Sequence, residues 1–277
     1  MLTPTSNGYA ESAEGLRVYY EIYGIGAPIV VLAGGLMDIS SMSQTIAPLS
    51  RKRQVIGIDL EGHGRTALRA TPMSHERNGD DVAAVLRHLK IAKADVAGYS
   101  HGADASIRMA IQHPEMVRNL IVVSSAAARD GWYPEVLKDM EGVSSAQADN
   151  MQQTPIYQRY AAVAAHPEQF PQLLDRLGEL MKKGYDWRSE IAKLPMPTLL
   201  LFADHDAVSM RHIAEFFALF GGGVRDAGWD DKPKFSRARL AIVPGYTHYN
   251  FAQGPDVARV IEAYLEQPTS SATQFSP

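Results

Sequence analysis

The fold is decided by one short stretch, Ala94–Gly102, which reads ADVAGYSHG. Its first half is the short apolar run of a buried strand, and residues 101–113 have the composition of a helix. The pattern G-x-S-x-G centres on Ser100 at the junction. Glycines at these positions allow a tight turn from strand to helix, because a larger side chain would collide with the neighbouring backbone.

Such a turn holds the Ser100 hydroxyl outward in strained backbone geometry. It also places the backbone amide of His101 at a helix N-terminus, where free N–H groups favour a developing negative charge. We therefore predict that Ser100 is a nucleophile and that His101 donates one oxyanion hydrogen bond. The alternative is a plain turn of small residues.

Short apolar runs alternate with amphipathic segments along most of the chain. Strands are predicted at Leu16–Ile22, Pro28–Leu32, Val55–Asp59, Ala94–Gly98, Leu120–Val123, Thr198–Phe202 and Leu240–Val243. Helices are predicted at Asp80–Leu89, His101–His113, Ser209–Phe220 and Asp256–Leu265. This alternation predicts an α/β fold with a mostly parallel sheet covered by helices on both faces.

The segment 128–192 interrupts the alternation, since it is poor in strand signals. We expect it to form an inserted helical cap on a core made of residues 1–127 and 193–266. Its apolar side chains include Trp132, Tyr133, Met140, Met151, Tyr157, Tyr160, Phe170, Met181, Tyr185 and Trp187. More than half of these should pack the cap onto the sheet, and the others could line a wide pocket. The polar residues 267–277 are expected to be a flexible tail.

Composition excludes several classes of protein. The 277 residues include 27 Lys+Arg and 31 Asp+Glu, a formal net charge of −4, and 45% are apolar, which is ordinary for a globular protein. No basic run could neutralise a nucleic-acid backbone, so no nucleic-acid partner is expected. No apolar stretch has the roughly 18–20 residues of a membrane helix, and the N-terminus lacks the layout of a secretory signal. We therefore expect a cytoplasmic protein without a membrane partner. The absence of cysteine excludes thiol nucleophiles and thiolate zinc sites.

A serine nucleophile needs a base, and nine histidines are candidates. On this architecture the acid and then the histidine follow the serine along the chain. His248 lies in the segment PGYTHYN, directly after the last predicted strand, and the carboxyl ends of parallel strands are where such sheets carry their sites. We predict that His248 is the base. His75, His88 and His113 fall on helical stretches, which favours surface positions.

The base needs a carboxylate to hold its tautomer and to stabilise the imidazolium ion. The segment FADHD at residues 202–206 follows the penultimate predicted strand and offers two candidates, Asp204 and Asp206. We favour Asp206. Asp204 lies closer to the end of the strand and could instead make a structural turn bond, but it stays open as the alternative acid.

The second oxyanion amide should come from a loop that approaches the nucleophile closely. The segment LAGGL at residues 32–36 follows an early strand, and we predict that the Gly35 amide is this donor. A nucleotide-binding glycine turn is the alternative, but the chain has neither G-x-G-x-x-G nor the Lys-Ser/Thr of a P-loop.

The segment DLEGHGR, residues 59–65, ends another predicted strand. Its acid and glycines predict a fixed turn beside the site. A metal site made by Asp59, Glu61 and His63 is the alternative, but their spacing does not place three ligands on one regular face. We expect no metal.

Taken together, these segments resemble the α/β-hydrolase superfamily over nearly the whole chain. The signals that appear in family order are Gly34-Gly35, Asp59-x-x-Gly62-His63-Gly64, the elbow at Ser100, Asp206 and His248. The resemblance implies an eight-stranded, mostly parallel sheet with an inserted helical cap, and a triad in which Ser100 attacks, His248 is the base and Asp206 orients it. One departure is Ala33, where many members have histidine, and this should alter the packing of the oxyanion loop.

Within the superfamily, the chain looks like bacterial serine esterases. It is also similar to the serine esterases that open macrolide antibiotic lactones, in residues 34–42, 98–102 and 221–223. The resemblance implies hydrolysis of a carboxylic ester or lactone through an acyl-enzyme without any cofactor, with a macrolide lactone, and hence antibiotic resistance, as the sharper hypothesis. The alternatives are acyl transfer or C–C bond hydrolysis on the same triad, and a non-catalytic member that binds a small ligand.

Overall fold

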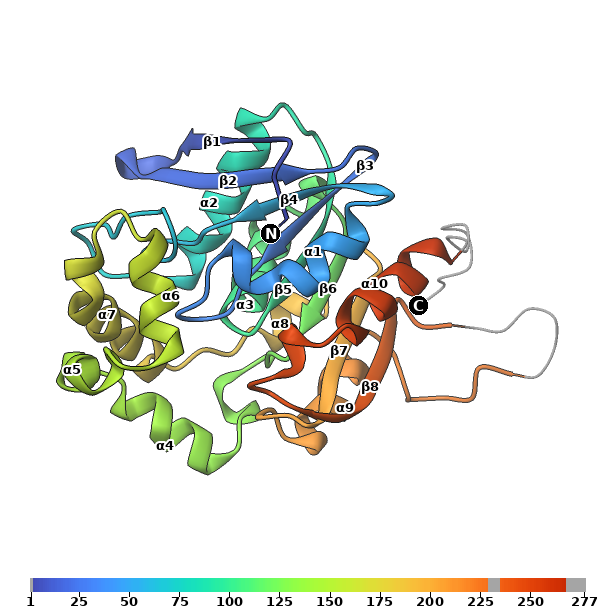
Figure 1. Ribbon diagram of the computed structural model, residues 1–277. Helices are drawn as coiled ribbons and strands as arrows, with labels where there is room; N and C mark the ends of the chain where they lie inside the picture. The colour runs from blue at the N-terminus through green and yellow to red at the C-terminus, as the bar shows by residue number, and fades with distance from the viewer. Residues whose placement is uncertain (1, 229–234, 268–277) are drawn as a thin grey trace.

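An eight-stranded sheet runs through the centre of the computed structural model, which describes residues 2–228 and 235–267 (Figure 1). The strands are β1 (Ser6–Glu11), β2 (Arg17–Tyr23), β3 (Ala27–Leu32), β4 (Arg53–Ile58), β5 (Ala94–Tyr99), β6 (Val117–Val123), β7 (Thr198–His205) and β8 (Ala238–Thr247). Their order across the sheet is β1-β2-β4-β3-β5-β6-β7-β8. The pairs β1/β2 and β2/β4 are antiparallel and the other pairs are parallel, which confirms the predicted sheet.

The central strands are rich in apolar residues because helices cover both faces of the sheet. All six residues of β5 are buried. The edge strands carry weaker signals. The sequence analysis missed β1, in which only Ala10 is buried, and β8 extends beyond the predicted 240–243 with mostly half-buried or exposed residues.

The helices α1 (Ser43–Leu49) and α10 (Asp256–Glu266) pack on one face of the sheet. On the other face lie α2 (His75–His88), α3 (His101–Gln112) and α9 (Met210–Leu219). The helix predicted to begin at Asp80 begins five residues earlier, where the Ser74 side chain accepts a hydrogen bond from the Arg77 amide (3.2 Å). Its first turn is polar, so hydrophobic periodicity alone could not show it.

Five helices lie between β6 and β7, and Figure 1 shows α4–α7 gathered beside the sheet. They are α4 (Pro134–Gly142), α5 (Ala148–Met151), α6 (Pro155–Val163), α7 (Phe170–Lys182) and α8 (Arg188–Ile191). Tyr160, Phe170 and the leucines of α7 form an apolar cluster of their own. Among the ten apolar side chains singled out in this segment, Tyr133 is the one classed as exposed.

Short 3₁₀ helices occupy several connections, at Ala13–Gly15, Ile39–Met42, Pro114–Met116, Arg129–Gly131, Ser145–Gln147, Pro167–Gln169 and Phe251–Gln253. Within residues 2–228 and 235–267, no helix combines the length and the hydrophobicity needed to cross a membrane. The predicted tail, residues 267–277, lies outside the described residues from position 268 onward.

Candidate active site

Ser100 occupies the sharp turn between β5 and α3. Its backbone has φ 53° and ψ −120°, a left-handed conformation that a side-chain-bearing residue rarely adopts. A Cβ added to Gly98 would lie 2.1 Å from the Gly102 carbonyl oxygen, and one added to Gly102 would lie 2.5 Å from that of Ala33. Both positions therefore require glycine, which is the physical basis of the G-x-S-x-G pattern.

Three side chains from separate strand ends meet at this turn. The Oγ atom of Ser100 lies 3.1 Å from Nε2 of His248, and Nδ1 of His248 lies 3.0 Å from Oδ1 of Asp206. Ser100 follows β5, Asp206 follows β7 and His248 follows β8, and these three strands run in parallel. The structure thus brings together the three residues that the sequence singled out.

Asp206 is held by more than the histidine. Its Oδ2 accepts hydrogen bonds from the Ser124 hydroxyl (2.5 Å) and the Ala203 amide (3.1 Å). Burial alone would raise the pKa of Asp206, but the hydrogen bonds from His248, Ser124 and Ala203 hold it below its usual value. An ionised Asp206 favours the His248 tautomer with the proton on Nδ1, and this leaves Nε2 free to face Ser100.

Asp204 makes different contacts. Its Oδ1 accepts hydrogen bonds from the amides of Gly245 (2.9 Å) and Tyr246 (3.3 Å), and it pairs with the exposed His205 at 3.1 Å. These bonds tie the end of β7 to β8. Asp204 therefore makes the structural turn bonds that were one of its two predicted roles, and it does not contact His248 in the way that Asp206 does.

The contacts of three residues around His248 were not predicted from the sequence. Ser124, just after β6, has φ 54° and donates to Asp206. The Tyr99 hydroxyl donates to the His248 carbonyl, and Trp132 packs edge-on against the His248 ring with 5.5 Å between ring centres. A signal for Ser124 did exist: like Ser100, it is a polar residue that directly follows a strand of the parallel sheet.

The loops that carry the two predicted oxyanion amides are neighbours. A Cβ added to Gly35 would lie 3.9 Å from the Cβ of His101 and would meet nothing closer, so this position is open. Gly34, by contrast, is pressed against the Tyr99 ring, since a Cβ there would lie 3.0 Å from two ring atoms. Next in the loop, Leu36 has φ 59°.

The predicted turn at residues 59–65 is fixed by its acids. Asp59 accepts hydrogen bonds from the amides of Ile39 and Arg65, both at 2.9 Å, and Glu61 pairs with Arg69 at 2.6 Å. These carboxylates are thus already engaged. Asp59, Glu61 and His63 do not form a group of possible metal ligands among the described residues.

A cluster of buried histidines lies behind Ser100. The expectation that His75 is a surface residue is wrong, because the rings of Trp187 (5.1 Å between ring centres) and Tyr185 (5.5 Å) cover it. Burial lowers the pKa of His63 and of His75 to about 4, and lowers the pKa of His101 well below its usual value. All three rings are therefore neutral at pH 7.

A groove of about 450 Å³ lies beside the acid and the histidine loop. Its walls do not include Ser100 or His248, and they combine apolar and aromatic side chains with four acidic residues, Glu135, Asp139, Asp204 and Asp206. The Tyr249 side chain is 72% exposed, and its ring centre lies 5.5 Å from that of His248. A larger hollow of about 550 Å³, between β1–β2 and residues 65–71, includes none of the residues that gather around Ser100.

Comparison with known proteins agrees with this architecture. The sequence pattern of the alpha/beta hydrolase fold family matches residues 27–255. A relative from Azorhizobium caulinodans, named Putative carbamate hydrolase RutD, is 28% identical over 258 residues, which cover 87% of this chain and 91% of that protein. The 3-oxoadipate enol-lactonase 2 of Acinetobacter baylyi is 26% identical, over 72% of this chain and 79% of the relative.

Solved structures share the fold. A thermophilic esterase from Thermogutta terrifontis superposes with a TM-score of 0.70 at 19% identity, over 94% of this chain and 97% of the esterase.

Proposed function

This chain belongs to the α/β-hydrolase family, and from that premise we propose that it is a serine hydrolase that cleaves a carboxylic ester or lactone. The observation that carries the proposal is the continuous hydrogen-bonded chain from the Ser100 hydroxyl through the His248 ring to the Asp206 carboxylate. Relatives named as a carbamate hydrolase and an enol-lactonase support an acyl carbonyl as the reacting group.

In the first half-reaction, Ser100 Oγ attacks the substrate carbonyl carbon while Nε2 of His248 accepts the hydroxyl proton. Asp206 stabilises the imidazolium ion that results. The backbone amides of Gly35 and His101 donate to the oxyanion of the tetrahedral intermediate, and losing one such donor costs about 3 kcal/mol. His248 then protonates the departing alkoxide oxygen, which leaves Ser100 acylated.

In the second half-reaction, His248 removes a proton from water, which attacks the acyl carbon and releases the carboxylic acid. The proton returns to Ser100. Every proton transfer in this cycle passes through His248 Nε2, the ring nitrogen that faces Ser100 at 3.1 Å.

We propose that residues 128–192 act as a cap that selects the substrate. Trp132 from this segment and Tyr249 pack edge-on against the His248 ring, and Tyr133 and Tyr249 line the groove. The groove of about 450 Å³ falls within the roughly 300–1,000 Å³ that ligand pockets usually measure, and we propose that one group of the substrate extends from Ser100 into it. Among bulky cyclic esters, the macrolide lactones are the sharper proposal, on the resemblance of residues 34–42, 98–102 and 221–223.

The test is turnover of p-nitrophenyl acetate and butyrate by the wild type, Ser100→Ala and Ser189→Ala. Ser189 is an exposed serine of α8 and serves as the matched control. We expect Ser100→Ala to lower kcat by about a million-fold and Ser189→Ala to leave it unchanged. If the wild type hydrolyses no ester, the esterase proposal is wrong. That result would favour the alternative of a non-catalytic protein that binds a small ligand.

Substrate class is tested separately, by mass spectrometry of simple esters, lactones and macrolides after incubation with the protein. A macrolide that gains one water, with wild type but not with Ser100→Ala, supports the sharper proposal. Hydrolysis of small esters with no change in any macrolide contradicts it and leaves the esterase proposal intact.

A further inference from the structure

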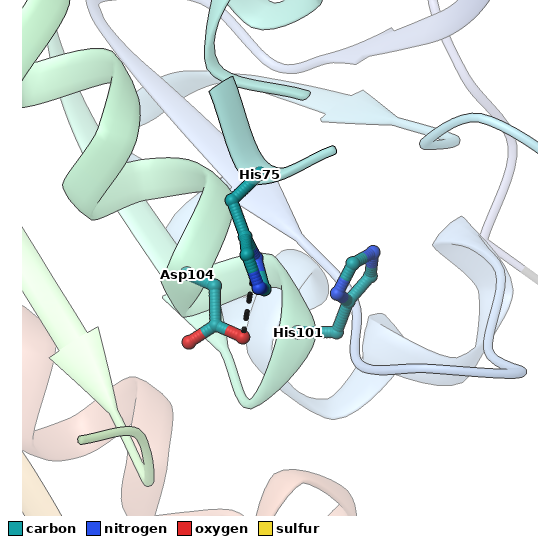
Figure 2. Close-up of side chains that lie close together, drawn as sticks. All are labelled: His75, His101 and Asp104. Atoms are coloured by element: carbon teal, nitrogen blue, oxygen red, sulfur yellow. Dashed lines mark ion pairs between the residues drawn. The ribbon is translucent and has the colours of Figure 1, made fainter. Parts of the chain in front are cut away.

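Two histidines and an aspartate converge in the interior behind Ser100. His75 is the first residue of α2, while His101 and Asp104 lie one turn apart at the start of α3. Figure 2 shows the His75 ring next to the Asp104 carboxyl group, with a dashed line between them, and the His101 ring to one side. One ligand atom from each lies within 4.8 Å of the other two, and Nδ1 of His75 is 3.8 Å from Oδ2 of Asp104.

The packing of two helices produces this convergence. A Cβ on Gly79 of α2 would lie 2.7 Å from the Met109 amide nitrogen of α3, so the two backbones are in direct contact at this point. The start of α2 therefore packs along α3, and His75 lies beside Asp104.

The polar atoms of this cluster are incompletely paired. Nδ1 of His75 is buried and has no hydrogen-bond partner, and the same is true of Oδ1 of Asn78. Leaving such an atom buried and unpaired costs about 1–3 kcal/mol. Asp104 is also buried, and its only ion-pair contact within the described part of the chain is the neutral His75. The cluster thus has an unpaired ligand atom and a buried carboxyl group that pairs with no cationic side chain within the described part of the chain.

Neighbouring residues already orient two of the three side chains. The Ser125 hydroxyl donates to Oδ1 of Asp104, which leaves Oδ2 toward His75. Nδ2 of Asn78 lies 3.1 Å from Nε2 of His101. Rotating the Asn78 side-chain amide by half a turn would let its unpaired Oδ1 accept a hydrogen bond from Nε2–H of His101. In that tautomer, His101 keeps a lone pair on Nδ1. Histidines that bind metals commonly donate their other ring N–H to such an acceptor.

We propose that His75, His101 and Asp104 form a binding site for a divalent transition-metal ion, with Zn²⁺ the best match. Two imidazoles and one carboxylate are a ligand set that Zn²⁺ uses, at about 2.0–2.2 Å from the metal. Ligand atoms of a tetrahedral site are then about 3.4 Å apart, so the present spacing requires side-chain rotations that draw the three groups inward. A bound ion would supply the positive charge that stabilises the ionised form of the buried Asp104 carboxyl group.

This site is coupled to the candidate active site through one residue. His101 directly follows Ser100, and its backbone amide is the proposed oxyanion donor. Drawing the His101 ring toward the ion would pull on the residue that carries this amide, at the start of α3. Zn²⁺ binding should therefore slow ester hydrolysis; this effect rests on the proposed function, whereas the binding itself does not.

The test is calorimetric titration with Zn²⁺ of the full chain after removal of metals with a chelator. We expect the wild type to bind one equivalent with a raised thermal midpoint, because the ion binds only the native state. His75→Phe, which suits the aromatic surroundings, and Asp104→Asn, which keeps the Ser125 contact, should each bind at least about a hundredfold more weakly. His88→Gln removes an exposed histidine of the same helix and should bind as the wild type does.

Two further measurements separate the outcomes. Ser100→Ala should bind Zn²⁺ like the wild type, so binding is measured even if the protein hydrolyses no ester. Anomalous diffraction from Zn²⁺-soaked crystals locates the ion without any variant. No binding by the wild type, unchanged affinity in His75→Phe and Asp104→Asn, or an ion found only elsewhere, such as at His248, would overturn the proposal.

Discussion

The Oγ atom of Ser100 lies 3.1 Å from Nε2 of His248, although 148 positions separate the two residues in the sequence. The distance depends on two parallel strands of one sheet, β5 and β8, which end at the same edge. On the other side of the ring, Nδ1 is occupied by Asp206 at 3.0 Å. The ring is therefore fixed from both sides, as a base that must shuttle a proton requires.

Asp206→Asn should lower kcat on p-nitrophenyl butyrate by about ten-thousand-fold, because an amide favours the wrong tautomer of His248. Asp204→Asn should change kcat by less than about tenfold, since Asp204 bonds to the amides of residues 245 and 246. The two variants form a matched pair in one loop. Loss of activity in Asp204→Asn alone would contradict the assignment.

Ser124→Ala tests a positioning residue. The Ser124 hydroxyl donates to Oδ2 of Asp206 at 2.5 Å, and a hydrogen bond to a charged group contributes about 1.5–3 kcal/mol. We expect the free energy of unfolding to fall by about that amount. Loss of the bond also loosens Asp206, so kcat should fall by about tenfold with KM unchanged. A normal kcat in a destabilised variant would reduce Ser124 to a structural residue.

The parts of this site that could be predicted from the sequence are those that depend on local backbone geometry. Gly98 and Gly102 are required by contacts within the turn itself, so the pattern marks Ser100 without knowledge of distant segments. His248 and Asp206 were predicted because each follows a strand, and the ends of parallel strands share one edge. The choice of Asp206 over Asp204 agrees with their contacts in the structure.

Other features depend on contacts between distant segments, and the sequence did not predict them. His75 lies at the start of a helix, and Tyr185 and Trp187, more than a hundred positions later, help to bury it. The strand β1 was missed because five of its six residues are not buried, so its sequence shows no alternation of apolar and polar residues. It is a strand because it pairs with β2.

Gly102→Ala tests the packing of the elbow. The added Cβ would lie 2.5 Å from the Ala33 oxygen and 2.7 Å from the Leu32 oxygen, both backbone atoms that cannot rotate away. Urea unfolding should show a loss of at least about 2 kcal/mol. Gly142→Ala is the control, because nothing lies within 4 Å of its added Cβ, and its stability should change by no more than about 1 kcal/mol.

His212→Gln tests a pH effect on stability. His212 is 3% exposed, its Nε2 accepts a hydrogen bond from the Ala127 amide at 3.0 Å, and burial lowers its pKa. Below about pH 6.5 the unfolded chain therefore binds a proton that the native His212 excludes, so wild-type stability is lost as the pH falls. Glutamine keeps an acceptor and does not titrate.

Urea unfolding of wild type and His212→Gln, from about pH 7.5 down to about pH 5, measures this effect. We expect a shallower loss of stability in the variant over that window. Parallel curves for the two proteins would show that His212 does not contribute to the pH dependence.

The central claim is that Ser100 becomes acylated, and covalent labelling tests it most directly. The protein is treated with a fluorophosphonate, digested, and the modified peptide is identified by mass spectrometry. We predict one adduct, on Ser100, that disappears in Ser100→Ala and forms far more slowly in His248→Gln. An unmodified Ser100 in the folded wild type, or an adduct on another residue that survives Ser100→Ala, would contradict the account.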